Sequence, residues 1–113
     1  MGYTNGQSIG LKKNMYIDMY TSKRSIHNGY IDVGTSFLTP TTAPRKDTRV
    51  VLQRKVGTTW VDVRGHSGYL ERLSPMYRLF KGIDSSKPLR VRFMIREWYG
   101  NNPTQYASYY VPV

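Results

Sequence analysis

The amino-acid sequence predicts an all-β domain, built as an antiparallel two-sheet sandwich of about seven strands. Its 10 glycines and 6 prolines recur about every ten residues and separate segments rich in Tyr, Val, Ile, Phe and Thr. Few segments place apolar residues at the helical spacing of three and four without such a breaker. The length of 113 residues allows one hydrophobic core, so residues 1–113 are interpreted as a single domain.

Two strands are expected in the first third of the chain, at residues 15–20 and 30–38. The first alternates apolar residues with tyrosine or aspartate, the period of a half-buried strand. An Asn-Gly pair at residues 28–29 tolerates positive φ and predicts a turn before the second strand. Residues 1–10 are polar and glycine-bearing, and a flexible start is expected there. Residues 39–47 contain two prolines and three consecutive charges, which predicts a surface connection between the two sheets.

A hairpin is expected in the middle of the chain. Its strands are residues 49–56 and 60–63, joined by a Gly-Thr-Thr turn. Residues 64–68 contain two glycines and are predicted to break the chain again. Residues 69–81 are interpreted as two short strands around a Ser-Pro bend, and one or two helical turns are the alternative because their apolar residues approximate helical spacing.

The clearest strand covers residues 89–98. Its apolar residues at 89, 91, 93 and 95 alternate with Arg90, Arg92, Met94 and Arg96, which predicts one core face and one basic face. Residues 100–103 form a turn signal, and residues 105–113 then predict a last strand that completes a C-terminal hairpin.

Two stretches of the chain resemble a known family. In residues 49–63 a strand of valine, leucine, glutamine and arginine turns into a tryptophan strand, and an Arg-Val-Arg strand near residue 91 precedes a closing valine-bearing one. These features resemble immunoglobulin-like domains of bacterial surface and secreted proteins. The resemblance implies two packed sheets with Trp60 as the central packing residue and a core that contains Val50, Leu52, Trp60, Val63, Val91 and Phe93. The chain departs from the family in having no cysteine pair, and in carrying Leu89 where such strands often have the tyrosine of a corner motif.

The charge balance predicts an anionic partner. Lys and Arg number 17 against 7 acids, a formal net charge of +10. Such a field attracts polyanions and speeds their encounter with the protein. The alternative is that the charge keeps a protein with 10 tyrosines in solution.

Residues for catalysis or metal binding are few. The histidines are His27 and His66, the glutamates are Glu71 and Glu97, and nothing around them forms a catalytic signature. His66 lies between glycines in an expected turn, where a solvated histidine is the simpler interpretation. The five aspartates are scattered and no cysteine is present, so no metal or cofactor is expected.

The predicted binding residues are arginines of one strand with neighbouring cations and tyrosines. Alternate strand residues are about 7 Å apart, so the three arginines of residues 90–96 would form a positive ridge. Guanidinium groups suit phosphate oxygens, and exposed tyrosines offer stacking surfaces for sugars or bases. The predicted site contains Arg90, Arg92, Arg96, Arg54, Lys55, Lys23, Arg24, Tyr99 and Tyr109. The alternative is that each pair of neighbouring cations belongs to an ordinary solvated surface.

These observations favour a non-enzymatic, secreted, cationic binding protein that associates as a monomer with an anionic component of a cell envelope. The partner would be a wall polymer such as teichoic acid or an anionic lipid, and the role could be adhesive or antimicrobial. Export assumes that a leader has been removed, and a native cytoplasmic protein is the alternative. Two other functions stay open: an intracellular, phage-type protein that binds nucleic acid or inhibits an enzyme, and a small basic ribonuclease-like hydrolase.

Overall fold

The computed structural model describes the chain at residues 5–10, 16–23, 29–38, 46–70, 75–84, 86–96, 98–99, 102–103 and 106–113. These residues form two four-stranded sheets and one two-stranded ribbon. All strand pairs described are antiparallel, which confirms the predicted all-β sandwich. Among the described residues there is no helix that is long and apolar enough to cross a membrane.

The first sheet has the strand order β1-β2-β3-β6. Its strands are β1 (Asn5–Gly10), β2 (Tyr16–Lys23), β3 (Ile31–Leu38) and β6 (Met76–Phe80). Sequence analysis predicted no strand before residue 15 and missed β1, because this polar, glycine-bearing segment has no apolar alternation. In β6, the structure confirms a short strand rather than a helical turn.

The second sheet has the strand order β10-β7-β4-β5. Its strands are β4 (Lys46–Val56), β5 (Thr59–Leu70), β7 (Leu89–Arg96) and β10 (Ala107–Pro112). The predicted C-terminal hairpin is confirmed, since β10 pairs with β7 from Ala107 to Pro112. Between these two strands, β8 (Trp98–Tyr99) and β9 (Asn102–Pro103) form the ribbon.

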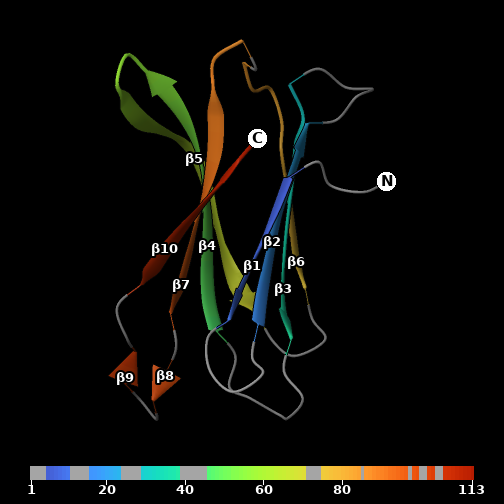
Figure 1. Ribbon diagram of the computed structural model, residues 1–113, viewed down its shortest axis with the longest axis vertical. Helices are drawn as coiled ribbons and strands as arrows, with labels where there is room; N and C mark the ends of the chain where they lie inside the picture. The colour runs from blue at the N-terminus through green and yellow to red at the C-terminus, as the bar shows by residue number, and fades with distance from the viewer. Residues whose placement is uncertain are drawn as a thin grey trace.

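The chain crosses between the two sheets three times, from β3 to β4, from β5 to β6 and from β6 to β7. Figure 1 shows the two sheets facing each other, with the second sheet on the left. The connection predicted at residues 39–47 does join the two sheets. Its last two residues, however, already belong to β4, and Asp47 is buried rather than exposed.

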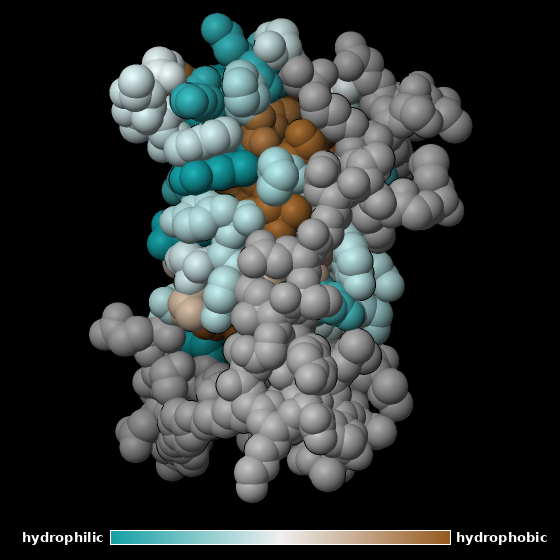
Figure 2. Space-filling view, viewed as in Figure 1, coloured by the Kyte–Doolittle hydropathy of each residue, from teal (hydrophilic) through white to brown (hydrophobic). Residues whose placement is uncertain are grey.

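The core lies between the sheets and takes alternate residues from each strand. Met19, Val33 and Phe80 of the first sheet face Val50, Leu52, Val91, Phe93 and Val111 of the second, and all are almost fully buried. Four predicted core residues are therefore confirmed: Val50, Leu52, Val91 and Phe93. Figure 2 shows apolar residues along the middle of the described surface, beside the hydrophilic residues of the second sheet.

Two predicted core residues, Trp60 and Val63, are not in the core. Residues 55–65 are exposed apart from Trp60, which is half-buried, and Figure 1 shows this end of the β4–β5 hairpin leaning away from the first sheet. Val63 is the extra residue of a bulge, because Leu52 pairs with Arg64 while Gln53 pairs with Asp62. Trp60 packs on the outer side of the sheet. The prediction that it is the central packing residue is therefore wrong.

The break predicted at residues 64–68 is also wrong, because β5 runs through it. Gly68 lies at a close approach between β5 and β6 rather than in a turn. A Cβ atom at this position would lie 2.9 Å from the Arg78 Nη2 and Met76 Sδ atoms of β6. The Arg78 Nη2 group donates to the Ser67 carbonyl and the Arg64 Nη1 group donates to the Lys81 carbonyl, so arginines close this side of the sandwich.

Candidate functional site

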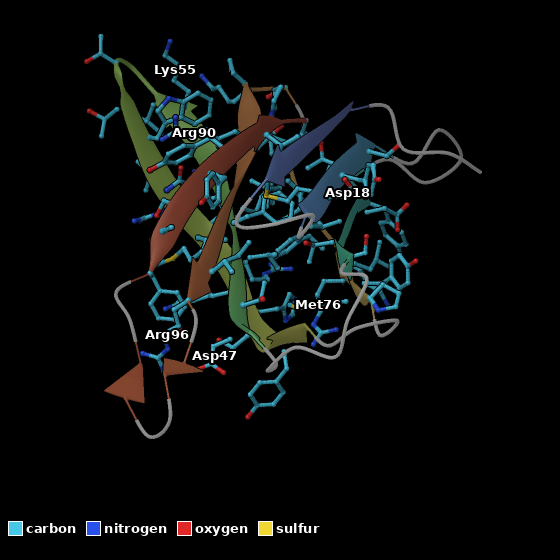
Figure 3. All side chains as sticks on the ribbon, turned by 60° about the horizontal axis from the view of Figure 1, so that its bottom comes forward. Asp18, Asp47, Lys55, Met76, Arg90 and Arg96 are labelled. Atoms are coloured by element: carbon cyan, nitrogen blue, oxygen red, sulfur yellow. The ribbon has the colours of Figure 1, made fainter. Side chains whose placement is uncertain are left out.

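Strand β7 presents its arginines on one side of the second sheet. Leu89, Val91, Phe93 and Ile95 are buried, whereas Arg90, Arg92, Met94 and Arg96 are half-buried and face outward. The six residue steps from Arg90 to Arg96 extend over about 20 Å of strand. Figure 3 shows these two arginines toward opposite ends of the same sheet, as the alternation of the sequence predicted.

The neighbouring strands add charges to this surface. The pairing of β4 with β7 places Asp47 beside Arg96, Arg49 beside Met94 and Gln53 beside Arg90. On the other side of β4, Asp62 of β5 lies beside Gln53. Lys55 follows Gln53 on the same side and is exposed. We call the outer side of this sheet the basic face; its described charged residues are Arg49, Lys55, Arg90, Arg92, Arg96, Asp47 and Asp62.

Each of the three β7 arginines is held through its Nε atom. Arg90 Nε donates to Gln53 Oε1 at 2.8 Å, and Arg92 Nε donates to Ser108 Oγ at 2.9 Å. Arg96 Nε donates to Asp47 Oδ2 at 3.0 Å and forms an ion pair with it. These acceptors lie on the flanking strands β4 and β10, so the sheet itself orients the guanidinium groups.

Aromatic rings restrain the same arginines further. The guanidinium carbon of Arg90 lies 4.3 Å from the ring centre of Trp60 and 4.1 Å from that of Tyr110. Arg96 lies 4.6 Å from the ring centre of Tyr106. These separations are within the range of cation–π contacts. The ring faces that meet Arg90 and Arg96 are therefore occupied by guanidinium groups.

Gln53 connects three strands at one end of the basic face. It accepts the hydrogen bond from Arg90 of β7, and its Nε2 group donates to Asp62 Oδ1 of β5 at 2.8 Å. The side chain is almost fully buried, so both amide atoms are satisfied within the protein. Gln53 thus sets the orientation of Arg90 and restrains the nearest carboxylate.

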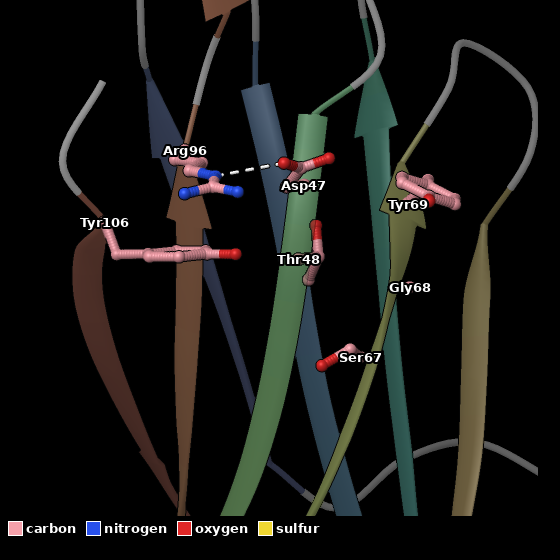
Figure 4. Close-up of a pocket in the computed structure, with 7 residues that line it drawn as sticks. All are labelled: Asp47, Thr48, Ser67, Gly68, Tyr69, Arg96 and Tyr106. Carbon is pink, nitrogen blue, oxygen red and sulfur yellow. Dashed lines mark hydrogen bonds and ion pairs between the residues drawn. The ribbon is translucent and has the colours of Figure 1, made fainter. Parts of the chain in front are cut away.

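At the other end of the basic face the surface is hollowed. The hollow has a volume of about 400 Å³ and is lined by Asp47, Thr48, Ser67, Gly68, Tyr69, Arg96 and Tyr106. In Figure 4 the Asp47–Arg96 ion pair lies between Tyr106 on one side and Tyr69 on the other. Side chains in this ion pair are 12% and 30% exposed, respectively, so its aspartate is much the better shielded of the two.

Comparison with family models, curated proteins and solved structures found no match.

Two of the predicted binding residues, Arg54 and Tyr109, do not lie on the basic face. Arg54 alternates with Gln53 and Lys55 and pairs with the buried Leu89, so it belongs to the other side of the sheet. Tyr109 pairs with Phe93 and packs against the core. Lys55 lies on the basic face. Arg24 lies outside the described residues, as do the side chains of Lys23 and Tyr99.

The outer side of the first sheet has the opposite character. Its described side chains on β2, β3 and β6 include Asp18, Asp32, Tyr20 and Tyr77, and no lysine or arginine is among those that the structure places there. Burial raises the pKa of the Tyr20 hydroxyl above its ordinary value of 10.0, and the hydrogen-bonded Asp18 raises it further. Among the described side chains, the outer side of the first sheet therefore carries acids, whereas that of the second sheet carries mainly cations.

Only part of the candidate catalytic and metal-binding side chains is described. The sequence predicted a turn at His66, which is wrong. His66 lies in β5, and the centre of its ring is 5.1 Å from the centre of the Phe80 ring. His27, Glu71 and Glu97 lie outside the described residues. No three His, Asp or Glu side chains among those described are grouped closely enough to hold a metal ion.

Sequence reasoning missed the residues that orient the arginines: Asp47, Gln53, Trp60, Ser108 and Tyr110. Gln53, Ser108 and Tyr110 are in phase with the outward side of predicted strands, which is a usable signal. Asp47 was instead assigned to the connection at residues 39–47, and Trp60 to the core. The signal is incomplete because pairing depends on the register between strands, and the bulge opposite Leu52 shifts the register of β5.

Proposed function

We propose that the protein is a non-enzymatic, exported binding protein that uses the basic face to bind a linear anionic polymer of a cell envelope. The observation that carries this proposal is the row of β7 arginines, each held through Nε by a neighbouring strand. Guanidinium groups that are already oriented lose less conformational entropy when an anion binds.

Phosphodiester groups fit this arrangement. A guanidinium group held at Nε still carries two terminal NH₂ groups, whose forked geometry suits the oxygens of a phosphate. Arg90 and Arg92 are neighbours on one side of β7, about 7 Å apart, and can meet successive phosphates of a chain. A row of cations along a strand suits a linear polymer better than a planar bilayer.

The stacked aromatic residues favour a wall polymer over a nucleic acid. Single-stranded nucleic acids are usually bound by open aromatic rings on which bases stack. Here the rings of Trp60, Tyr106 and Tyr110 already stack against Arg90 or Arg96. We therefore expect charge-assisted contacts with phosphate to dominate, as in a teichoic-acid type of polymer whose backbone carries no bases.

The partner class is tested by co-sedimentation of the protein with isolated Gram-positive cell walls, with the same walls stripped of teichoic acid, and with anionic lipid vesicles. Binding of RNA and DNA is measured in parallel, each at about 0.05 M and about 0.15 M salt. The triple variant Arg90→Ala/Arg92→Ala/Arg96→Ala accompanies the wild type in each series.

Retention on intact walls at the higher salt, with loss on stripped walls and in the triple variant, is the expected result. Tight binding of RNA or DNA without wall retention would instead favour the intracellular nucleic-acid function. Cleavage of RNA during the incubation would favour the hydrolase. Retention on vesicles alone would assign the basic face to a lipid surface.

A further inference from the structure

The hollow at the end of the basic face differs from the rest of that face in its charge. Its charged lining residues are Asp47 and Arg96, which neutralise each other across 3.0 Å. The other described cations of the basic face, Arg49, Lys55, Arg90 and Arg92, do not line it. The charges of the described lining residues therefore balance, and these residues offer an anion no excess positive charge.

Its other lining groups are hydroxyls and aromatic rings. Ser67, Tyr69 and Tyr106 bring hydroxyl groups, and the Asp47–Arg96 pair brings carboxylate acceptors and guanidinium donors side by side. Tyr69 is 56% exposed and Tyr106 is 37% exposed, so part of each side chain is accessible to a ligand. Figure 4 shows the two tyrosines on opposite sides of the ion pair.

This combination matches the chemistry of a sugar ring. A pyranose presents vicinal hydroxyl groups that both donate and accept hydrogen bonds, and an adjacent carboxylate and guanidinium can meet such a pair. Its apolar C–H face can pack on the exposed part of the Tyr69 ring, since the ring of Tyr106 already stacks against Arg96. The volume of about 400 Å³ lies within the range of small-ligand pockets and is enough for one or two sugar residues.

We propose that the hollow formed by Asp47, Ser67, Tyr69, Arg96 and Tyr106 is a binding site for a neutral saccharide unit. The site rests on the proposed function in one respect. A sugar attached to the anionic polymer, or lying beside it, would bind in the hollow while the phosphates of the polymer contact Arg90 and Arg92. Binding of a free sugar does not require the polymer, so the two proposals can fail separately.

The test is a titration of ¹⁵N-labelled full-length protein with glucose, galactose and N-acetylglucosamine, followed by amide chemical shifts. Glycerol phosphate serves as the anionic arm. The variant Tyr69→Ala removes one wall of the hollow. Its matched control is Tyr77→Ala, since Tyr77 is equally exposed, at 60%, but lies on the outer side of the first sheet. Thermal melts establish that both variants are folded.

At least one sugar is expected to shift the amides around residues 47–48, 67–69, 96 and 106, with a dissociation constant of about 1–10 mM. The constant should stay the same when salt is raised to about 0.5 M, and Tyr69→Ala should weaken binding at least about tenfold while Tyr77→Ala leaves it unchanged. No shift with any of the three sugars, or shifts there with glycerol phosphate that salt abolishes, would overturn the proposal. Such a result would leave polymer binding by Arg90 and Arg92 standing.

Discussion

At Gly29 a positive φ and tight packing coincide in one residue. Its φ is 81°, and a Cβ atom there would lie 2.9 Å from the backbone oxygen of Ile83. The Gly29 carbonyl also accepts a hydrogen bond from the Ile83 amide at 2.9 Å, which fixes the chain before β7 against the start of β3. The Asn-Gly pair predicted this conformation, but the contact with Ile83 required the structure.

Replacement of Gly29 should therefore destabilise the protein more than replacement of Gly57. Gly57 has a similar φ of 63°, but no described heavy atom lies within 4 Å of where its Cβ atom would be, so Gly57→Ala meets conformational strain alone. We expect Gly29→Ala to lower the free energy of unfolding by about 3 kcal/mol and Gly57→Ala by about 1 kcal/mol. Urea denaturation of the two variants measures both values, and equal losses would contradict the close packing at Ile83.

Tyr20 predicts a pH dependence of stability. Burial, and then the adjacent Asp18, raise its pKa above the ordinary value of 10.0, so the folded protein holds this proton more tightly than the unfolded chain. The stabilising contribution is complete below pH 10 and is lost as the pH rises through the higher pKa of the folded state. We expect the wild type to lose stability more steeply above pH 10 than Tyr20→Phe, in urea denaturation at a series of pH values. Parallel curves would contradict the shift.

At the scale of the elements, β7 was predictable because it packs against strands on both sides and has one face in the core. Its strict alternation therefore appears in the sequence. The hairpin of β4 and β5 was less predictable, because its strands extend past the facing sheet and alternation does not report how far that sheet reaches. Trp60 and Val63 were assigned to the core for this reason, and β1 was missed because its sequence shows no alternation of apolar and polar residues.

The link that Gln53 makes between β4, β5 and β7 gives a prediction about element packing. Gln53→Ala removes the hydrogen bonds to Arg90 and Asp62 and should lower the free energy of unfolding by about 2 kcal/mol. Ser108→Ala removes only the bond to Arg92 and should cost about 1 kcal/mol. Urea denaturation measures both. If Gln53→Ala were as stable as the wild type, the side chain would not be holding the strands together.

At the scale of the whole molecule, we propose that the sandwich is of immunoglobulin-like type. Strands β2, β3 and β6 face β10, β7, β4 and β5, with β1 added at the edge of the first sheet. This order supports the assignment, since immunoglobulin-like sandwiches place their last two strands beside the third in one sheet and the first two in the other. The order of the strands depends on where each connection crosses, which residue patterns do not report.

The distribution of charge is the other property of the whole molecule. The basic face and the side that carries Asp18 and Asp32 lie on opposite sides of the sandwich (Figure 3). The net charge of +10 could be read from the sequence, but which of the described cations share the basic face follows from the pairing of the strands.

We propose that the polymer is bound through the position and orientation of the arginines and not through net charge alone. This proposal is tested by measuring the dissociation constant for a glycerol phosphate polymer at about 0.15 M salt with two variants of equal charge. Arg90→Ala/Arg92→Ala removes two cations of the basic face. Lys81→Ala/Lys87→Ala removes two exposed cations of the chain between β6 and β7.

We predict that the arginine variant binds at least about tenfold more weakly than the wild type, a loss of about 1.4 kcal/mol or more, because it loses oriented contacts to phosphate. The lysine variant should lose less than about threefold, since it changes only the long-range field. Equal losses in the two variants, with both folded by circular dichroism, would contradict a defined binding face and leave only the net charge to explain binding.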